Sequence, residues 1–205
     1  MFQRTRLSLL EDGAIRVKTL ALLRTSRLRL RPYTTSDRGW FVATFCDPVV
    51  MKHVDGALSE EAAGALFTAI LEGTRHRVFG AWCAECHGEV VGHGALLRDG
   101  DDLEVGYILP QQAWGKGYAT EIAEALIEYG LNTLGLERLI ATVDAGHVPS
   151  LRVLEKTGMS IRERVEDPDG LCLVYGINRT DYKGSGQPHE PAEPMTSQSA
   201  SRNPE

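Results

Sequence analysis

Residues 103–126 read LEVGYILPQQAWGKGYATEIAEAL and place a strand, a glycine-containing loop and a helix in immediate succession. Alternation predicts a strand over 103–109, with Glu104, Gly106 and Ile108 on one face and Leu103, Val105 and Tyr107 on the other. The helical period then predicts a long helix over 116–134 that Gly135 ends. Its apolar side carries Ala119, Ile122, Ala123, Leu126, Ile127, Gly130 and Leu134.

The loop before this helix has the features of an anion site. Gly115 and Gly117 let the backbone bend and approach a ligand closely. Unpaired first-turn N–H groups and the helix dipole favour negative charge, and Lys116 adds a positive side chain. We interpret the loop as a pyrophosphate site made of backbone donors; the alternative is a plain strand-to-helix turn. The spacing differs from a P-loop, and a dinucleotide fingerprint requires Gly or Ala where Thr120 stands.

Upstream of this stretch, the sequence predicts one strand, two helices and a meander. RLRLRPY at 27–33 alternates as a half-buried strand does. Residues 34–37 supply a capping signal for a helix with Trp40, Phe41 and Phe45 on its apolar side. These aromatic side chains are expected to belong to the core or to the wall of the site that binds a substrate. A second helix is expected over 59–72, with an apolar stripe at Ala62, Ala63, Leu66, Phe67, Ile70 and Leu71. Strands over 77–84 and 89–97, joined at His87-Gly88, complete an antiparallel meander with 103–109.

Downstream, a strand over 137–144 is followed by a short helix over 151–157, with Pro149 in its first turn and Gly158 at its end. A hairpin over 159–165 and 171–178 closes the pattern. The fold class is therefore mixed α/β. We expect one domain over 23–180, an N-terminal extension over 1–22, and a disordered tail over 181–205 that is too polar to offset its ordering entropy.

Composition narrows the class of protein. The 205 residues carry a net charge of −6, which disfavours nucleic-acid binding. No run approaches the roughly 18 apolar residues of a membrane span, and the N-terminal apolar run is too short for a secretory signal. We expect a cytoplasmic protein without nucleic-acid or membrane partners. Cys83 and Cys86 form a C-x-x-C that suggests either a zinc half-site or redox pair, or two reduced thiols; we favour the thiols and expect no metal.

Three motifs in order resemble one family. Residues 112–117, QAWGKG, match Q/R-x-x-G-x-G/A, the acetyl-CoA pyrophosphate motif of the GNAT superfamily of N-acetyltransferases. TSRLRLRPYTTSD at 25–37, EVGYILPQQAWGKGYATE at 104–121 and VPSLRVLEKTGM at 148–159 are similar to its ribosomal-protein N-terminal acetyltransferase-like (RimJ/RimL-type) branch. The resemblance covers about residues 23–179.

The resemblance implies a mostly antiparallel central sheet flanked by helices, in which strand 103–109 splays away from the strand carrying 139–143. The pantetheine arm of acetyl-CoA then lies in the cleft. Expected cofactor-binding residues are Tyr107, Ile108, Leu109, Gln112, Trp114, Gly115, Lys116, Gly117, Tyr118, Ala119, Thr120, His147 and Ser150.

The same resemblance implies direct attack of an amine on the thioester. Glu104 is the candidate base; the alternative is a solvated strand glutamate. Ser150 matches the serine of the family's N-x-x-S segment and would donate to the leaving thiolate or position the arm, unless it is a plain helix N-terminal residue. His147 stands where the family commonly has Asn, which puts that contact with the coenzyme in question; histidine can donate a hydrogen bond and also titrates near neutrality.

We therefore expect acetyl transfer from acetyl-CoA to a primary amine, with a protein N-terminal α-amine as one acceptor. A small-molecule acceptor, such as an amino acid, polyamine or antibiotic, is one alternative. A coenzyme-binding regulatory module without catalysis is another. Homodimers are common in the family, so a homodimer is compatible with the resemblance.

Overall fold

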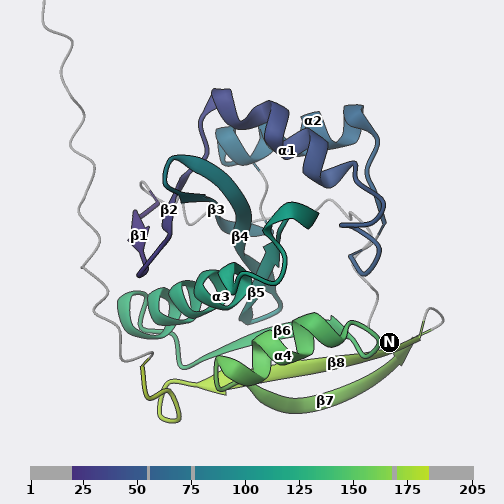
Figure 1. Cartoon of the computed structure of the whole chain (residues 1–205). Coiled ribbons are helices and arrows are strands. Elements are labelled where there is room, and N and C mark those ends of the chain that lie inside the picture. The colour runs from purple at the N-terminus through teal and green to yellow at the C-terminus, as the bar shows by residue number, and fades with distance from the viewer. Residues whose placement is uncertain (1–19, 55, 75–76, 168–169, 185–205) are drawn as a thin grey trace, which may run out of the picture.

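The computed structural model of the chain describes residues 20–54, 56–74, 77–167 and 170–184 (Figure 1). Residues 1–19 of the expected N-terminal extension (1–22) and residues 185–205 of the expected tail (181–205) lie outside these ranges, so these parts stay predictions. Within the described residues, no helix combines the length and apolar character needed to cross a membrane.

One sheet runs through the described part of the chain, with eight strands in the order β1-β2-β3-β4-β5-β6-β8-β7. The strands are β1 (Leu23–Arg24), β2 (Arg29–Pro32), β3 (Val78–Cys86), β4 (Glu89–Asp99), β5 (Asp102–Ile108), β6 (Arg138–Asp144), β7 (Ser160–Asp167) and β8 (Gly170–Asn178). Neighbouring strands are antiparallel except for β5 and β6, which are parallel. The mixed, mostly antiparallel fold expected from the sequence is confirmed.

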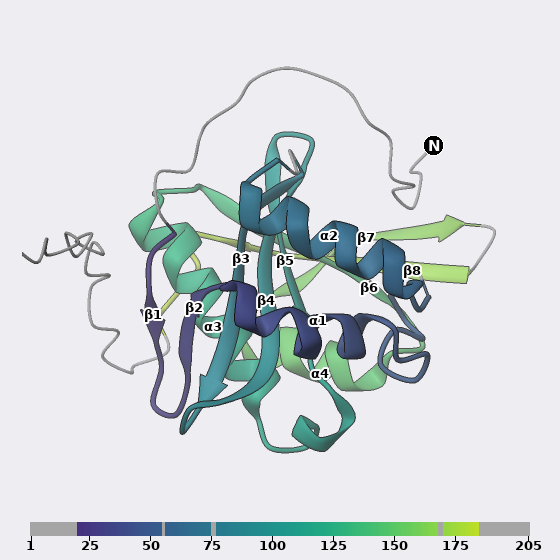
Figure 2. The same cartoon turned by 90° about the horizontal axis from the view of Figure 1, so that it is seen from above.

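Helices cover both faces of this sheet, as Figures 1 and 2 show. One side carries η1 (Thr35–Asp37), α1 (Arg38–Phe45) and α2 (Glu60–Glu72). The other side carries α3 (Tyr118–Glu128), its π-helical extension η3 (Tyr129–Thr133) and α4 (Val148–Lys156). The short 3-10 helix η2 (Gln111–Ala113) lies between β5 and α3. Two buried clusters result, one under α1 and α2 and one under α3 and α4.

The alternation of side chains along β3 separates the two cysteines of the C-x-x-C. Ala81 and Cys83 belong to the cluster under α1 and α2, whereas Trp82 and Cys86 belong to the cluster under α3 and α4. Because the two thiols lie on opposite faces of the sheet, the strand does not bring them together as a half-site or disulfide. Burial raises the pKa of the Cys83 thiol to about 12, which keeps it protonated.

Local sequence signals explain where several helices and turns begin. The Thr34 and Asp37 side chains form a capping box before α1. Ser59 Oγ accepts from the Ala62 N–H at 3.2 Å at the start of α2. His87 and Gly88 adopt φ of +53° and +84°, the left-handed pair of a tight hairpin turn.

Three expectations were wrong in detail. The long helix begins at Tyr118 rather than at residue 116, because Gly117 is left-handed with φ of +82°, and its last turn is π-helical. The first long strand begins at Arg29, because residues 25–28 form a turn closed by the Thr25 N–H and the Leu28 carbonyl at 2.9 Å. Ala62 and Leu71 are exposed, so the buried stripe of α2 is narrower than predicted.

The expected parting of β5 from β6 is present. Against β4, strand β5 pairs in continuous register from Asp102 to Ile108. Against β6 it makes a single pair, Glu104 with Ile140, while β6 pairs with β8 along its whole length. The two parallel strands therefore form a V that opens toward their C-terminal ends.

Candidate active site

Glu104 lies at the vertex of this V. Its Oε1 accepts from the backbone N–H of Thr142 at 2.9 Å, and its Oε2 lies 3.5 Å from Arg77 Nη2. The carboxylate thus binds a β6 donor at the point where strand pairing stops. Only 13% of the side chain is exposed, so the alternative of a solvated strand glutamate does not fit.

The surroundings of Glu104 affect its acidity in opposite directions. Burial raises the pKa of the carboxyl group, and the hydrogen bonds from Thr142 and the charge of Arg77 oppose this only in part. The net pKa is above the usual range for glutamate. A carboxylate whose charge is disfavoured in this way is a stronger proton acceptor, which is what general-base catalysis requires.

The two arms of the V approach each other again through side chains. Tyr107 of β5 points toward α4, and its hydroxyl donates to the Ser150 carbonyl at 3.4 Å. Burial raises the pKa of Tyr107 to about 12, so it stays a donor. The Leu109 carbonyl accepts from Trp114 Nε1 at 2.8 Å, and Ile108 packs under α1 and α2. Of the residues expected to pair with the pantetheine arm, Leu109 thus already has a partner for its carbonyl.

The loop after β5 presents open backbone amides. The Trp114 N–H donates to the Gln111 carbonyl at 3.1 Å, and the next backbone bond runs from the Glu121 N–H to the Gly117 carbonyl at 3.2 Å. Between them, the N–H groups of residues 115–120 find no backbone acceptor within the described chain. Gly115 has φ of +72°, and a Cβ built there would meet no atom within 4 Å. These donors therefore surround open space at the start of an 11-residue helix, a geometry suited to a diphosphate.

The other predicted loop residues surround this cradle. Gln112, Trp114 and Lys116 are exposed, while Tyr118, Ala119 and Thr120 form the half-buried first turn of α3. The loop predicted from the sequence is thus brought together as one surface.

Two residues beside the cradle were not predicted. The Arg27 guanidinium lies 5.0 Å from the centroid of the Tyr118 ring and forms an ion pair with Glu121. Glu121 also accepts from Thr25 Oγ1 at 2.6 Å, which fixes the β1–β2 turn against α3. The partners are more than 90 residues apart, so only a basic residue and a first-turn glutamate were visible in the sequence.

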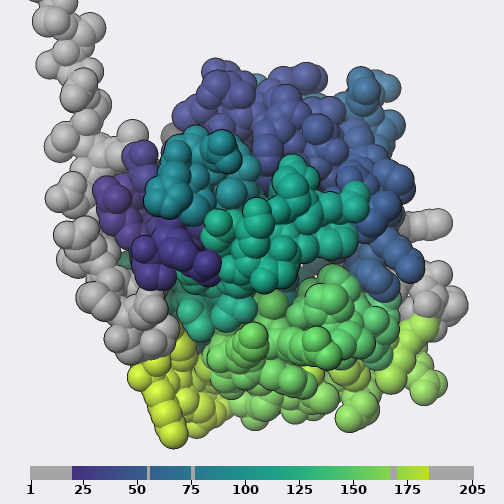
Figure 3. Space-filling view, viewed as in Figure 1, coloured from purple at the N-terminus to yellow at the C-terminus, as the bar shows by residue number. Residues whose placement is uncertain are grey.

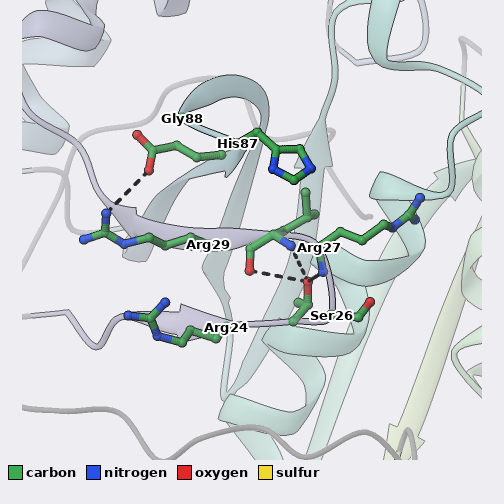
Figure 4. A pocket seen from close by; sticks show the side chains of 9 residues that line it. Arg24, Ser26, Arg27, Arg29, His87 and Gly88 are labelled. Carbon is green, nitrogen blue, oxygen red and sulfur yellow. Dashed lines mark hydrogen bonds and ion pairs between the residues drawn. The ribbon is translucent and has the colours of Figure 1, made fainter.

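A shallow hollow next to this turn does not form part of the site. It is lined by Arg24, Thr25, Ser26, Arg27, Leu28, Arg29, Glu85, His87 and Gly88. In Figure 4 Arg24 and Arg29 point to one side and Arg27 to the other, and Arg29 faces Glu85 at 3.9 Å. Because the three guanidinium groups do not converge, they offer no concentrated anion site, and the loop amides are the better candidate.

At the β6 arm, three side chains meet before α4. His147 is the N-cap residue of α4, and its ring stacks on His53 with centroids 4.4 Å apart and planes 10° apart. His53 Nδ1 lies 2.9 Å from Asp144 Oδ2. Burial lowers the pKa of His147, the neighbouring His53 acts in the same direction, and Asp144 opposes both. His147 is therefore neutral at physiological pH. Ser150 lies in the following turn, where its N–H donates to the His147 carbonyl at 3.0 Å.

Segment 46–58 between α1 and α2, of which the structure describes every residue except 55, lies across the open end of the V. Asp47 Oδ2 accepts from Gln111 Nε2 at 3.0 Å, which ties the segment to η2 after β5. His53 ties it to Asp144 at the end of β6. Figure 3 shows its blue atoms beside the green atoms of α4. His53 and Asp144 were not predicted as site residues, because His53 lies in a stretch without periodicity and its partner is 91 residues away.

Comparisons with known proteins agree with this geometry. The family model for the acetyltransferase (GNAT) domain matches residues 27–160. An uncharacterized N-acetyltransferase of Bacillus licheniformis is 30% identical over 178 residues, 79% of this chain and 98% of the relative. An acetyltransferase structure from Agrobacterium tumefaciens is similar with 26% identity and a TM-score of 0.66, covering 85% of this chain and 99% of its own. Spermidine N-acetyltransferase from Vibrio cholerae, solved with CoA and spermine, has a similar fold with 16% identity and a TM-score of 0.68, over 77% of this chain and 99% of its own.

Proposed function

The chain belongs to the GNAT acetyltransferase family, and on that premise we propose that it transfers an acetyl group from acetyl-CoA to a primary amine. The observation that carries this proposal is the open V beside a cradle of unpaired amides. The amides of residues 115–120 would hold the pyrophosphate, with Gln112 and Lys116 beside it. The arm would lie between β5 and β6 along Tyr107 and Ile108. The similar fold of a relative solved with CoA supports this arrangement.

The amine would approach from the face covered by α1 and α2. Glu104 lies on the same face of β5 as Ile108, which packs under those helices. Asp144 extends from the neighbouring β6 beside segment 46–58. Two carboxylates on one face attract a cationic acceptor, in keeping with the acidic net charge of the chain.

We propose a peptide α-amine as the acceptor, in line with the resemblance to the RimJ/RimL-type branch. Such an amine has a pKa of about 7.7 to 8.0, against about 10.4 for lysine, so a larger share arrives neutral at pH 7. A small cationic molecule is the second candidate. It is favoured by the pair of carboxylates and by the spermine bound in the structure of the Vibrio cholerae relative.

The reaction needs two proton movements. The neutral amine nitrogen attacks the thioester carbonyl, the C–N bond forms, and the C–S bond breaks. Glu104 would take the proton that the nitrogen loses at this stage, and this proton would then pass to the thiolate of CoA, which leaves as the free thiol and returns Glu104 to its ionised form. Ser150 would donate a hydrogen bond to that sulfur. His147 would contact the arm as a neutral donor in place of the family's usual Asn.

The test is release of free thiol from acetyl-CoA with a panel of amines: peptides with different first residues, an amino acid, spermine and ribostamycin. We expect at least one amine to raise thiol release well above the hydrolysis rate, with the acetylated amine found by mass spectrometry. Tight acetyl-CoA binding without thiol release for any amine would contradict the enzyme and favour a regulatory module.

A further inference from the structure

His53 has no role in the reaction described so far, and at the V it lies in a cluster with Asp144 and His147. The members of this cluster come from three separate elements, namely segment 46–58, the end of β6 and the N-cap of α4. About a quarter of the His53 side chain and a third of Asp144 are exposed, so water reaches the cluster. The charged and titratable groups that face His53 are Asp144 from β6 and His147 from α4.

Hydrogen bonding fixes which nitrogen of His53 carries the proton. An ionised carboxylate only accepts hydrogen bonds, so Asp144 Oδ2 requires Nδ1 of His53 to be the donor. The other oxygen, Oδ1, accepts from the Gly146 N–H at 2.8 Å, which holds the carboxylate in place. Nε2 of His53 is then the ring's proton acceptor. Stacking on neutral His147 fixes the ring plane.

The sheet places the bond between His53 and Asp144 on the side from which the amine would come. Leu139, Ala141 and Val143 of β6 lie in the cluster under α3 and α4, so Thr142 and Asp144 project from the other face. Glu104 of β5 projects from that same face, because its neighbours Leu103 and Val105 face α3. Asp144 follows Thr142 by two residues, about 7 Å farther along β6 toward the open end of the V.

A charged amine brings one proton more than Glu104 can carry. An amine that arrives as R–NH₃⁺ loses one proton before attack and another as the C–N bond forms. One of these protons ends on the thiolate of CoA and the other leaves to solvent. Glu104 is buried and holds one proton at a time. A basic group at the site that also exchanges with water would carry the first proton from a charged amine to solvent.

We propose that Nε2 of His53 accepts the first proton from the acceptor ammonium and releases it to solvent, while Asp144 holds the ring in position. Glu104 takes the second proton during attack. This inference rests on the proposed amine acetylation. His53 is thereby a catalytic residue at the wide end of the V, and Asp144 is a positioning residue.

The test compares the wild-type protein with His53→Gln, whose amide can donate to Asp144 but cannot carry a proton. Thiol release from acetyl-CoA is measured between pH 6 and 10 with a peptide α-amine that the wild type acetylates. Below the pKa of this amine, about 7.7 to 8.0, we expect kcat/KM to fall by about tenfold to a hundredfold. Above it the loss should shrink toward wild type, because the amine then arrives neutral.

If the wild type also accepts a lysine side-chain amine, whose pKa is about 10.4, the fall in kcat/KM of His53→Gln with this amine should persist to higher pH. Imidazole added to His53→Ala should restore activity at low pH, and Asp144→Asn should reproduce part of the loss. His87→Asn is the matched control: His87 is exposed in a turn with φ of +53°, which Asn tolerates, so activity should not change.

Different failures lead to different conclusions. Equal loss at every pH, no loss, or no rescue by imidazole would overturn the role of His53 while leaving the enzyme assignment intact. If His53→Gln is unstable, shown by its thermal unfolding, the imidazole result with His53→Ala decides. A wild-type protein that releases no thiol with any amine would contradict the proposed function and this inference with it.

Discussion

The two edges of β5 differ in how far they pair with a neighbouring strand. Toward β4, the strand pairs continuously from Asp102 to Ile108. Toward β6, it pairs once, at Glu104, and then departs. One edge of a single strand therefore pairs within the sheet, while the other leaves main-chain groups where we propose that the pantetheine arm lies as an added strand would.

Two buried carboxylates on the face covered by α1 and α2 also differ, one on the closed side of the sheet, where β2 and β3 pair continuously, and one on the open side, at the V. On the closed side, Asp37 receives two bonds from Arg31, at 2.7 and 2.8 Å, and Arg31 also bonds Glu85 at 2.7 Å. Each carboxylate of this network therefore has a guanidinium partner. On the open side, Glu104 faces Arg77 at 3.5 Å and has a raised pKa. The contrast predicts that removing charge costs stability on the closed side and turnover on the open side.

The largest expected effect is on turnover in Glu104→Gln. Without a base at the vertex of the V, kcat should fall by about a thousandfold, and the dependence of kcat on pH should flatten. The thiol-release assay over pH 5 to 9 measures both. An unchanged pH–rate profile would remove Glu104 from the role of base.

The same variant should gain stability. Because the pKa of Glu104 is raised in the folded state, its contribution to stability is full below the usual value near 4.5 and is lost as pH rises through the folded value. Glutamine avoids that loss, so the melting temperature of the variant relative to wild type should be higher at pH 7 than at pH 4. The opposite trend would mean that the folded protein favours the ionised form of Glu104 over the protonated form.

Asp37→Asn tests the closed side. Breaking a buried pair by removing one charge costs about 3 kcal/mol, so urea unfolding should show a loss of that size at pH 7. Burial alone would raise the pKa of Asp37, but the bonds from Arg31 and Thr34 outweigh it and lower the pKa. The wild-type advantage is therefore present above pH 4 and lost as pH falls further. Affinity for acetyl-CoA should be retained. A loss of affinity would show that the pair of Arg31 and Asp37 also affects the coenzyme site.

Local chemistry explains what the sequence predicts well. The alternation at 103–108, the capping box at Thr34 and the left-handed turns at Gly88 and Gly135 each depend on a few neighbouring residues. The open amides at Gly115 and Gly117 belong to this class as well. The loop with open amides therefore lies where the sequence predicts a phosphate site, and its helix starts only two positions later than expected.

Contacts between distant segments explain what was missed. Glu104 is buried because Thr142 and Arg77 approach it from other elements, which alternation along one strand does not reveal. The bond between His53 and Asp144 depends on where segment 46–58 crosses the V. Such partners become neighbours only when distant parts of the chain fold together, so no local pattern in the sequence indicates them.

Gly117→Val tests whether the open amides hold the coenzyme. A branched side chain at φ of +82° should displace these amides and weaken acetyl-CoA binding at least about a hundredfold, roughly 2.7 kcal/mol, by calorimetry. Gly73→Val is the matched control, because Gly73 ends α2 with φ of +64° and open space around it. Both variants should lose about 1–2 kcal/mol of stability from backbone strain. Equal affinity in the two variants would contradict the loop assignment.

The smallest effect is expected for Tyr107→Phe, which removes the bond across the V. The hydroxyl donates to the Ser150 carbonyl at 3.4 Å, a long bond worth less than about 1 kcal/mol. If packing under α3 and α4 sets the width of the V, KM for acetyl-CoA should change less than about threefold, with little shift in melting temperature. A tenfold rise in KM would instead show that this bond keeps β5 and the start of α4 in the geometry that the coenzyme needs.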